Sequence, residues 1–406
     1  MAGQFDIVVA GGGLVGASLA CALEGSGFSV AQVEAVPRAV GLAPPSFDER
    51  NLALARASVN ALEALGVWRH LAEAPAPIRH IHVSSRGDFG AVRLDAARHR
   101  LDAFGAVVPA RVLGAALEAR VAELRDVRPL RPARVVGITQ ATEHIELELD
   151  GAEGARSIRT RLLVAADGTR STLRTQLGIG AREHDYAQTL FVATVALERA
   201  HGGVAYERFT GDGPVALLPL AGNRAGSVCT VAAVDAPTVA TLDDDGYRAL
   251  LQERFGYRLG RFGRVGRRSA YPLGLLRAES LVAPRAVLVG NAAQTLHPIG
   301  AQGFNLGLRD ALTLAQLLAD ATAGADPGAP ALLQDYATLR EHDRERTIAF
   351  SDGLVRAFAN PFPPLRLLRS LGLVALDRVP GLASGLVAGA MGFRGEVPRL
   401  ALGDGL

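Results

Sequence analysis

One short stretch decides the fold class of this chain: Ile7-Val8-Val9-Ala10-Gly11-Gly12-Gly13-Leu14-Val15-Gly16. Its first four residues are apolar and predict a buried strand of a parallel sheet. The glycines match G-x-G-x-x-G, in which the first permits a tight turn, the second lets a pyrophosphate approach the backbone, and the third lets a helix pack on the strand. The N-terminus of that helix then attracts the anion through its free N–H groups and its dipole.

The residues that follow complete a β-α-β unit. A helix is expected over residues 17–23 and a second strand over 29–33, and Glu34 closes that strand. An acid at this place accepts hydrogen bonds from an adenosine ribose and disfavours a ribose with a 2′-phosphate. The unit therefore predicts a site for NAD or FAD and does not decide between them.

The rest of the chain divides into a continued parallel fold, an antiparallel region and a helical tail. Short alternating runs from about residue 185 to 275 are typical of an antiparallel sheet. Elsewhere we expect strands at 78–83, 91–94, 135–138, 145–149, 162–166 and 286–289, and helices at 50–65, 111–124, 308–318 and 330–358. We therefore predict an α/β fold in which an antiparallel domain interrupts a dinucleotide-binding domain.

Composition and charge exclude several classes of protein. The chain has 406 residues, 43 basic and 41 acidic side chains and a net charge of +2, so no nucleic-acid partner is expected. Its 2 cysteines cannot build a disulfide scaffold, and no histidine spacing predicts a metal site. All 43 basic residues are arginine, which rules out chemistry that needs a lysine. We expect neither a signal peptide nor a membrane span, and hence a cytoplasmic protein that can contact the inner membrane peripherally.

Two further motifs decide between NAD and FAD. The first runs from Leu163 to Arg174 and places Asp167-Gly168 at the end of a strand. The second runs from Val287 to Gly307 and joins a strand, a turn and a glycine-rich loop that opens a helix. Together with the N-terminal glycines, these motifs resemble the three motifs of the FAD-dependent aromatic hydroxylases of the p-hydroxybenzoate hydroxylase type. The three occur in the same order as in that family, and the resemblance covers residues 5–320. The resemblance implies a p-hydroxybenzoate-hydroxylase-like FAD-binding fold with an inserted antiparallel substrate domain and a helical C-terminal tail.

The third motif narrows the resemblance to one subgroup. The family usually has Asp and His where this chain has Asn291 and Gln294. The strings 290–299 and 302–307 are similar to the subgroup of ubiquinone biosynthesis, in particular to 2-polyprenyl-6-methoxyphenol hydroxylase. Further similar stretches are residues 47–50, 82–87, 207–210 and 268–273. One departure is Gly300-Ala301, where the subgroup usually has Ala-Gly, and this exchanges the residue that can take a positive φ.

The resemblance implies a set of cofactor-binding residues. Gly11, Gly13, Leu14, Val15, Gly16 and Glu34 would hold the adenosine and the pyrophosphate of FAD. Arg50 and Arg111 would lie near the pyrophosphate or the ribityl chain, with Asp167 and Asn291. Pro298 and Gly303 would touch the isoalloxazine, and the helix that starts near Phe304 and Asn305 would direct its positive end at the flavin.

No residue is singled out as the catalyst. His297, Tyr206 and Tyr271 are weak candidates, since a packed histidine and two tyrosines that pack within a sheet explain them better than a catalytic role does. The resemblance implies that NAD(P)H reduces FAD, that a C4a-hydroperoxyflavin forms with O₂, and that it hydroxylates a polyprenylated methoxyphenol. The alternatives are a flavin-dependent reductase or dehydrogenase without oxygen insertion, and a non-catalytic member of a quinone-biosynthesis complex.

The domain bounds and the partners complete the expectations. The FAD-binding domain is expected over 1–75, 100–180 and 275–350, the substrate domain over 76–99 and 181–274, and a helical segment over 351–406. Partners are the polyprenyl phenol, O₂, and either a multi-enzyme complex or a second copy of the chain. Leucines and arginines interleave after Pro363-Pro364, so residues 360–395 are predicted to contact a membrane or a partner, or else to pack on the FAD domain.

Overall fold

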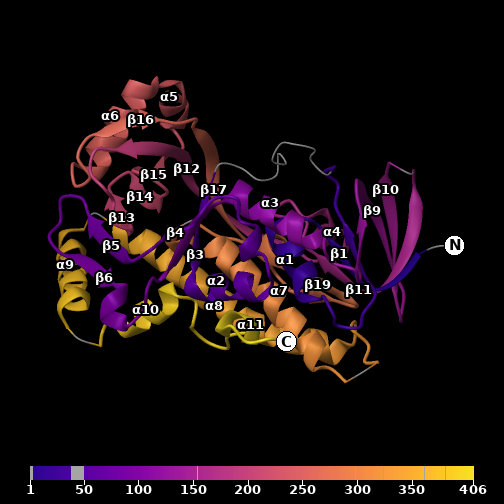
Figure 1. The fold of residues 1–406 in the computed structure, drawn as a ribbon. Coiled ribbons are helices and arrows are strands. Elements are labelled where there is room, and N and C mark those ends of the chain that lie inside the picture. Colours follow the sequence, from indigo (N-terminus) through magenta and orange to yellow (C-terminus); the bar gives the residue numbers. More distant parts are fainter. Residues whose placement is uncertain are drawn as a thin grey trace.

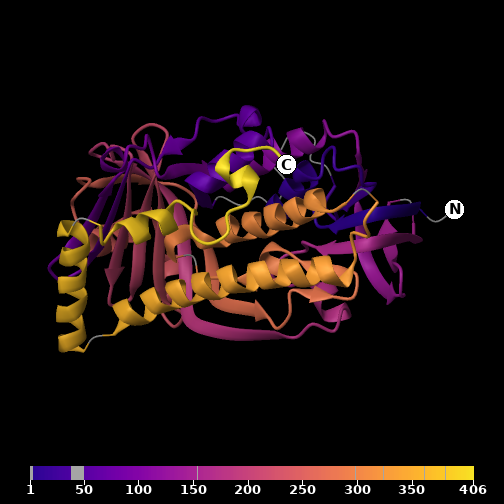
Figure 2. The same ribbon diagram turned by 90° about the horizontal axis from the view of Figure 1, so that it is seen from below.

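The computed structural model describes residues 3–37, 50–152, 154–297, 299–322, 324–360, 362–379 and 381–406. The molecule is elongated, with the N-terminal strands near one end and helix α9 (Pro363–Arg378) at the other (Figures 1 and 2). The motif residues 47–49 and Pro298 lie outside the described residues. Two large sheets and one small sheet, with helices around them, make up the described part.

The first sheet contains the parallel strands that the N-terminal motif predicted. Strand β1 (Gly3–Ala10) lies between β2 (Val30–Val33) and β11 (Arg156–Ala165), and it is parallel to both. The remaining strands are β8 (Val127–Leu130), β9 (Ala133–Gln140), β10 (Ile145–Gly151), β18 (Val282–Ala283) and β19 (Ala286–Leu288). Strand β1 is covered on both faces, which explains why it is a continuous apolar run.

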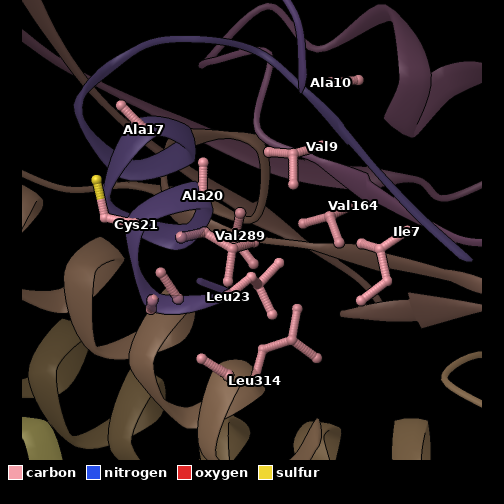
Figure 3. Packing of buried hydrophobic residues seen from close by; sticks show 14 of the residues in the cluster. Ile7, Val9, Ala10, Ala17, Ala20, Cys21, Leu23, Val164, Val289 and Leu314 are labelled. Carbon is pink, nitrogen blue, oxygen red and sulfur yellow. The ribbon is translucent and has the colours of Figure 1, made fainter. Parts of the chain in front are cut away.

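Helices cover this sheet and bury its core. They are α1 (Leu14–Ala22), α2 (Arg56–Ala64), α3 (Ala110–Val121), α4 (Thr172–Gln176), α7 (Gln302–Asp320), α8 (Pro330–Ala359) and α11 (Arg399–Leu402). Figure 3 shows Ile7 and Val9 of β1 and Val164 of β11 with Leu23, just after α1, and Leu314 of α7 in one apolar cluster. Figure 2 shows α7 and α8 side by side along the molecule.

The glycines of the N-terminal motif differ in what surrounds them. Gly11 has φ +123°, and a Cβ on it would lie 2.3 Å from the Ala166 carbonyl oxygen. A Cβ on Gly16 would lie 2.1 Å from the Gly11 carbonyl oxygen, so the helix approaches the turn too closely for any side chain. A Cβ on Gly13 would meet no atom within 4 Å, which leaves space for a ligand.

The second sheet separates a packed face from an open one. Its path is β20 (Gln294–Thr295), β17 (Ser269–Ala278), β12 (Ala181–Leu197), β15 (Arg224–Ala232), β14 (Gly213–Leu220), β13 (Val204–Thr210), β5 (His80–Ser85) and β6 (Ala91–Asp95), and β16 (Phe262–Val265) pairs with β12. One face packs on α6 (Asp244–Phe255), beside α5 (Ala236–Thr241). The other face lines the cavity described below.

One prediction about secondary structure is wrong. The helix expected over residues 50–65 begins with a strand, β3 (Asn51–Ala55), and only α2 is helical. Strand β3 pairs with β7 (Gly105–Pro109), which also pairs with β4 (Ala76–Pro77). The side chain of Asn305 accepts hydrogen bonds from Ala55 N (2.9 Å) and donates one to the Ala53 carbonyl (3.0 Å). Distant partners therefore override the local helical pattern.

A further difference concerns the start of a helix. Helix α7 begins at Gln302, earlier than residue 308. The tail forms α9 and α10 (Ser384–Ala390), with α9 packed beside β6 at the end of the second sheet (Figure 1).

The close approach at Gly16 generates a stability prediction. Gly16→Ala should lower the free energy of unfolding of the FAD-free protein by about 3 kcal/mol, because the new methyl group overlaps the Gly11 carbonyl. Urea-induced unfolding measures this change. Gly13→Ala is the matched control in the same turn and should change the value by less than about 1 kcal/mol. Equal effects of the two substitutions would contradict this account of the turn.

Candidate active site

A cavity of about 1120 Å³ lies between the first sheet, the second sheet and the C-terminal helices. One end is lined by Gly13 and Asn291, and by Gly303 at the start of α7. The opposite end is lined by Leu373 of α9 and Leu386 of α10. The cavity therefore connects the nucleotide-binding turn with the far end of the molecule.

The turn beside the polar end of the cavity has the features of a nucleotide cradle, although Glu34 and Asp167 themselves are not among the residues that line the cavity. The Glu34 carboxylate accepts hydrogen bonds from Gly12 N (2.5 Å) and Val36 N (2.7 Å), which hold it at the end of β2. One oxygen of Asp167 accepts from Leu173 N at 3.2 Å. Its other oxygen is buried, and no described residue donates to it. The open space at Gly13 and this unpartnered oxygen fit a bound dinucleotide.

A buried carboxylate holds the turn that carries Asn291. Asp310 of α7 accepts hydrogen bonds from Gly290 N (3.0 Å) and from the Gln294 amide (2.7 Å). Its other oxygen accepts from the Arg340 guanidinium of α8 at 2.8 Å. Burial alone would lower the pKa of Arg340, but Asp310 and Asp343 outweigh it and raise that pKa. Gln294, which stands where the wider family usually has His, thus holds the turn in place. Asn291, which stands where the family usually has Asp, is exposed and lines the cavity.

The start of α7 also reaches the cavity. Gly303 and Phe304 line it, and a Cβ on Gly303 would meet no atom within 4 Å. Gly300 has φ +69° and ψ 12°, so the glycine of the reversed Gly300-Ala301 pair is the residue that takes the left-handed conformation. The Asn305 side chain, in contrast, is bound to β3 and to the Ser58 hydroxyl at 2.7 Å, so it positions α7.

The two predicted arginines are placed differently. Arg50 lines the cavity, and its guanidinium carbon lies 5.2 Å from the centre of the Tyr271 ring. Arg111 donates to Glu73 at 2.6 Å and is not among the cavity-lining residues. The structure therefore brings Arg50, and not Arg111, to the site.

His297 is buried beside aromatic rings. It is 1% exposed, and burial lowers the pKa of His297 to about 4, so its imidazole is neutral at physiological pH. Its Nδ1 accepts a hydrogen bond from Ile299 N at 3.3 Å, and no described residue forms a hydrogen bond with Nε2. The Tyr186 ring packs edge-on against it at 5.1 Å. Burial and Asp352 raise the pKa of Tyr186 to about 12, so Tyr186 is also neutral.

The two candidate tyrosines of the second sheet lie in different surroundings. The Tyr206 ring packs against Phe255 of α6 at 5.4 Å and against His82 at 5.5 Å, and Tyr206 is also among the residues that line the cavity. Tyr271 lies on β17 beneath Arg50. Tyr206 therefore lies at the cavity, whereas Tyr271 is not among the residues that line it.

Sequence reasoning assigned no role to Glu207, which lines the cavity. A signal was present, because Glu207 alternates with Ala205 and Phe209 along β13 and so shares their apolar face. Asp310 was also missed, since its partners lie 16 to 30 residues away in the sequence.

Comparisons with known proteins agree with this geometry. The profile of a family described as FAD binding domain matches residues 4–351. The chain belongs to this family. It is a flavoprotein hydroxylase that uses FAD, which confirms the prediction from the three motifs.

Relatives of this FAD-binding hydroxylase match nearly the whole chain. Ubiquinone hydroxylase UbiL of Rhodospirillum rubrum is 38% identical over 402 residues, which are 98% of this chain and 92% of that protein. The 3-demethoxyubiquinol 3-hydroxylase of Escherichia coli K12 is 33% identical over 390 residues, 96% of this chain and 98% of that protein. The predicted subgroup is thereby confirmed.

Solved structures show the same fold. The OxyS anhydrotetracycline hydroxylase from Streptomyces rimosus has a TM-score of 0.74 and 25% identity, over 97% of this chain and 77% of that one. The p-nitrophenol 4-monooxygenase PnpA from Pseudomonas putida has a TM-score of 0.79 at 19% identity, over 98% and 100%. The predicted fold class is confirmed.

The open space at Gly13 generates a prediction about FAD. Gly13→Leu should fold normally, because nothing in the protein occupies that space, and should lose FAD affinity by at least about 100-fold, because the side chain takes the place of the pyrophosphate. Flavin absorbance after dialysis against excess FAD measures this. Gly353→Leu on α8, where a Cβ would also meet nothing within 4 Å, is the control that should keep its flavin. A yellow Gly13→Leu protein would contradict the assignment.

Proposed function

We propose that this hydroxylase inserts one oxygen atom from O₂ into the ring of a polyprenylated methoxyphenol in ubiquinone biosynthesis, at the position para to the ring hydroxyl. The supporting observation is the continuous cavity, which begins at the FAD cradle and ends against apolar residues of α9 and α10. A long hydrocarbon tail suits that far end, since burying apolar surface contributes about 25 cal/mol per Å². The names of the relatives support the same substrate class.

The cofactor-binding residues follow from the cradle. We assign the adenosine and pyrophosphate to Gly11, Gly13, Leu14, Val15, Gly16 and Glu34, the ribityl region to Arg50, Asp167 and Asn291, and the flavin ring to the loop before α7 with Gly303 and Phe304. Bound FAD supplies the chemistry, taking electrons from NAD(P)H and activating O₂. The protein orients the phenol ring and excludes water.

The cavity wall formed by strands β12 and β15 is suited to excluding water from the phenol ring of the proposed substrate. Leu190 and Val192 of β12 and Val228 of β15 line the cavity, and His297 beside them is neutral. A neutral, apolar wall disfavours bound water and charged groups. It therefore protects a reactive oxygen species from solvent without supplying a competing acid.

The oxygen source separates this proposal from a reductase or a non-catalytic scaffold. Under ¹⁸O₂, the protein with NAD(P)H and 2-decyl-6-methoxyphenol should form the para-hydroxylated quinol with one ¹⁸O atom, detected by mass spectrometry. In H₂¹⁸O with ordinary O₂ the product should carry no label. NAD(P)H consumption without labelled quinol would favour the reductase, and absence of both NAD(P)H consumption and product would favour the scaffold.

We also propose that the outer face of α9 contacts the membrane in which such a substrate resides. Leu367, Leu368 and Leu371 are 52%, 62% and 49% exposed, while Leu373 of the same helix is buried and lines the cavity. The helix thus presents apolar side chains to the outside at the place where the cavity ends. No helix among the described residues is long and apolar enough to cross a bilayer.

The arginines of α9 contribute less to this contact than their spacing predicts. Asp88 forms ion pairs with both Arg366 and Arg369 at 2.6 Å. The positive charges of these two arginines are therefore neutralised within the protein and do not attract lipid headgroups. Arg378 is exposed and its one carboxylate contact, with Asp377, is at 3.8 Å. Apolar contact should therefore dominate over attraction to anionic lipid.

Vesicle flotation tests this surface. The triple substitution Leu367→Ser, Leu368→Ser and Leu371→Ser should lower binding to phosphatidylethanolamine–phosphatidylglycerol vesicles at least tenfold, because each buried leucine contributes more than about 1 kcal/mol. Flavin content should stay unchanged. Val136→Ser with Val234→Ser, at exposed sites on other elements, is the control. Undiminished flotation of the triple variant, or binding abolished by 0.5 M NaCl, would contradict an apolar anchor.

A further inference from the structure

The cavity face of the second sheet carries one carboxyl group. Glu207 lies on β13 between Ala205 and Phe209, which face the same way, and its neighbours in register are Ala216 of β14 and Val83 of β5. The other cavity-lining residues of the described strands of this sheet have no carboxyl group. Apolar side chains therefore surround an ionisable one.

Glu207 has no partner within the protein. None of the described residues donates a hydrogen bond to its carboxylate or forms an ion pair with it, although part of its surface remains accessible from the cavity. Burial raises the pKa of Glu207 to about 7, and burial is the one cause of this shift. An unpartnered carboxylate is unfavourable in such surroundings unless a ligand donates to it.

The charged groups around the cavity do not alter this environment. Strands β14 and β5 present Ala216 and Val83 to Glu207, and α8 approaches β13 through Phe358, whose ring stacks on Phe209 with centroids 3.6 Å apart. The ionisable residues that line the cavity from other elements are Arg50, His297, Arg309, Arg340, His342, Asp343, Arg346, Arg394 and Glu396. No described hydrogen bond or ion pair joins any of them to Glu207, and none of them contributes to the shift in its pKa.

We propose that Glu207 accepts the hydrogen bond of the substrate's ring hydroxyl and then takes its proton during hydroxylation. This inference rests on the proposed function, because it requires a phenol in the cavity. An apolar pocket disfavours water that could receive the proton of the hydroxyl. Among the described strands of this sheet, Glu207 is the one carboxylate that lines the pocket. With its raised pKa, Glu207 is close to the value that suits a base at physiological pH.

The proton transfer balances within the reaction. The ring carbon para to the hydroxyl gives an electron pair to the incoming oxygen and forms the new C–O bond, while the bond between the two oxygen atoms derived from O₂ breaks and its electron pair stays on the other oxygen. Electron density moves from the hydroxyl oxygen into the ring, its O–H bond breaks, and the proton passes to Glu207. The ring carbon next loses its own hydrogen as a proton, which the departing oxygen takes up as it becomes water. The carbonyl oxygen recovers the proton from Glu207, and the aromatic diol is released with Glu207 ionised again.

The rate of product formation should depend on pH, because only the ionised carboxylate of Glu207 can accept the proton. Below pH 7 Glu207 is protonated and cannot accept the proton, so kcat for product formation should fall about tenfold per pH unit. Glu207→Gln, which keeps the shape and loses the base, should lower kcat by about 100- to 1000-fold and remove this dependence. Glu207→Asp should keep the pH dependence at a reduced rate. Glu183→Gln, an exposed carboxyl on β12, is the control and should behave as the wild type.

Ligand binding gives a readout that needs no turnover. At pH 8 the FAD-loaded wild type should bind 2-decyl-6-methoxyphenol at least tenfold more tightly than its O-methyl ether, because only the phenol donates to a carboxylate. At pH 5.5 this preference should shrink. In Glu207→Gln it should be small and independent of pH, as followed by the change in flavin fluorescence.

The outcomes separate this inference from the proposed function. If the wild type forms no labelled quinol but prefers the phenol in a pH-dependent, Glu207-dependent way, the reaction assignment fails and the contact to the hydroxyl stands. If Glu207→Gln keeps the wild-type rate, its pH profile and its phenol preference, the inference is overturned. If either the rate profile or the binding preference alone is unchanged, the corresponding role, as base or as hydrogen-bond acceptor, is refuted.

Discussion

The carboxylate of Asp310 is the interaction on which the site depends. It is buried, it accepts from the backbone of Gly290 and the amide of Gln294, and it pairs with Arg340, which is 2% exposed. Removing one partner of such a pair leaves an uncompensated buried charge and costs about 3–5 kcal/mol. The pair therefore forces the turn after β19 to stay in register with α7 and α8.

That register sets the position of the nucleotide-binding helix. A Cβ on Gly307 would lie 2.9 Å from the Val15 side chain of α1 and 3.0 Å from the Gly290 Cα. Three segments that are far apart in the sequence thus meet at contact distance, and only small residues permit it. The open space at Gly13 and the start of α7 then face one cavity from two sides.

The cavity divides polar and apolar tasks between the two sheets. The first sheet and its loops bring the groups that fit a dinucleotide, while the second sheet contributes an apolar wall whose opposite face packs on α6. At the far end of the cavity, helix α9 has two apolar faces: Leu373 is buried and lines the cavity, whereas Leu368 is exposed on the outer surface. The proposed function requires both sheets, because the first sheet lacks the apolar wall and the second lacks the cofactor cradle.

The sequence by itself determined the β-α-β unit, the identity of the cofactor and the family. These follow from contiguous residues, since strand and helix periodicities and the glycine spacing are local properties. It did not reveal the strand β3, because that strand exists through pairing with β7 and through Asn305. Nor did it show that Asp88 captures Arg366 and Arg369, or that Glu207 lies unpaired in an apolar cavity. Tertiary structure alone decided these, because the charge state and exposure of a side chain depend on neighbours that the chain brings from distant positions.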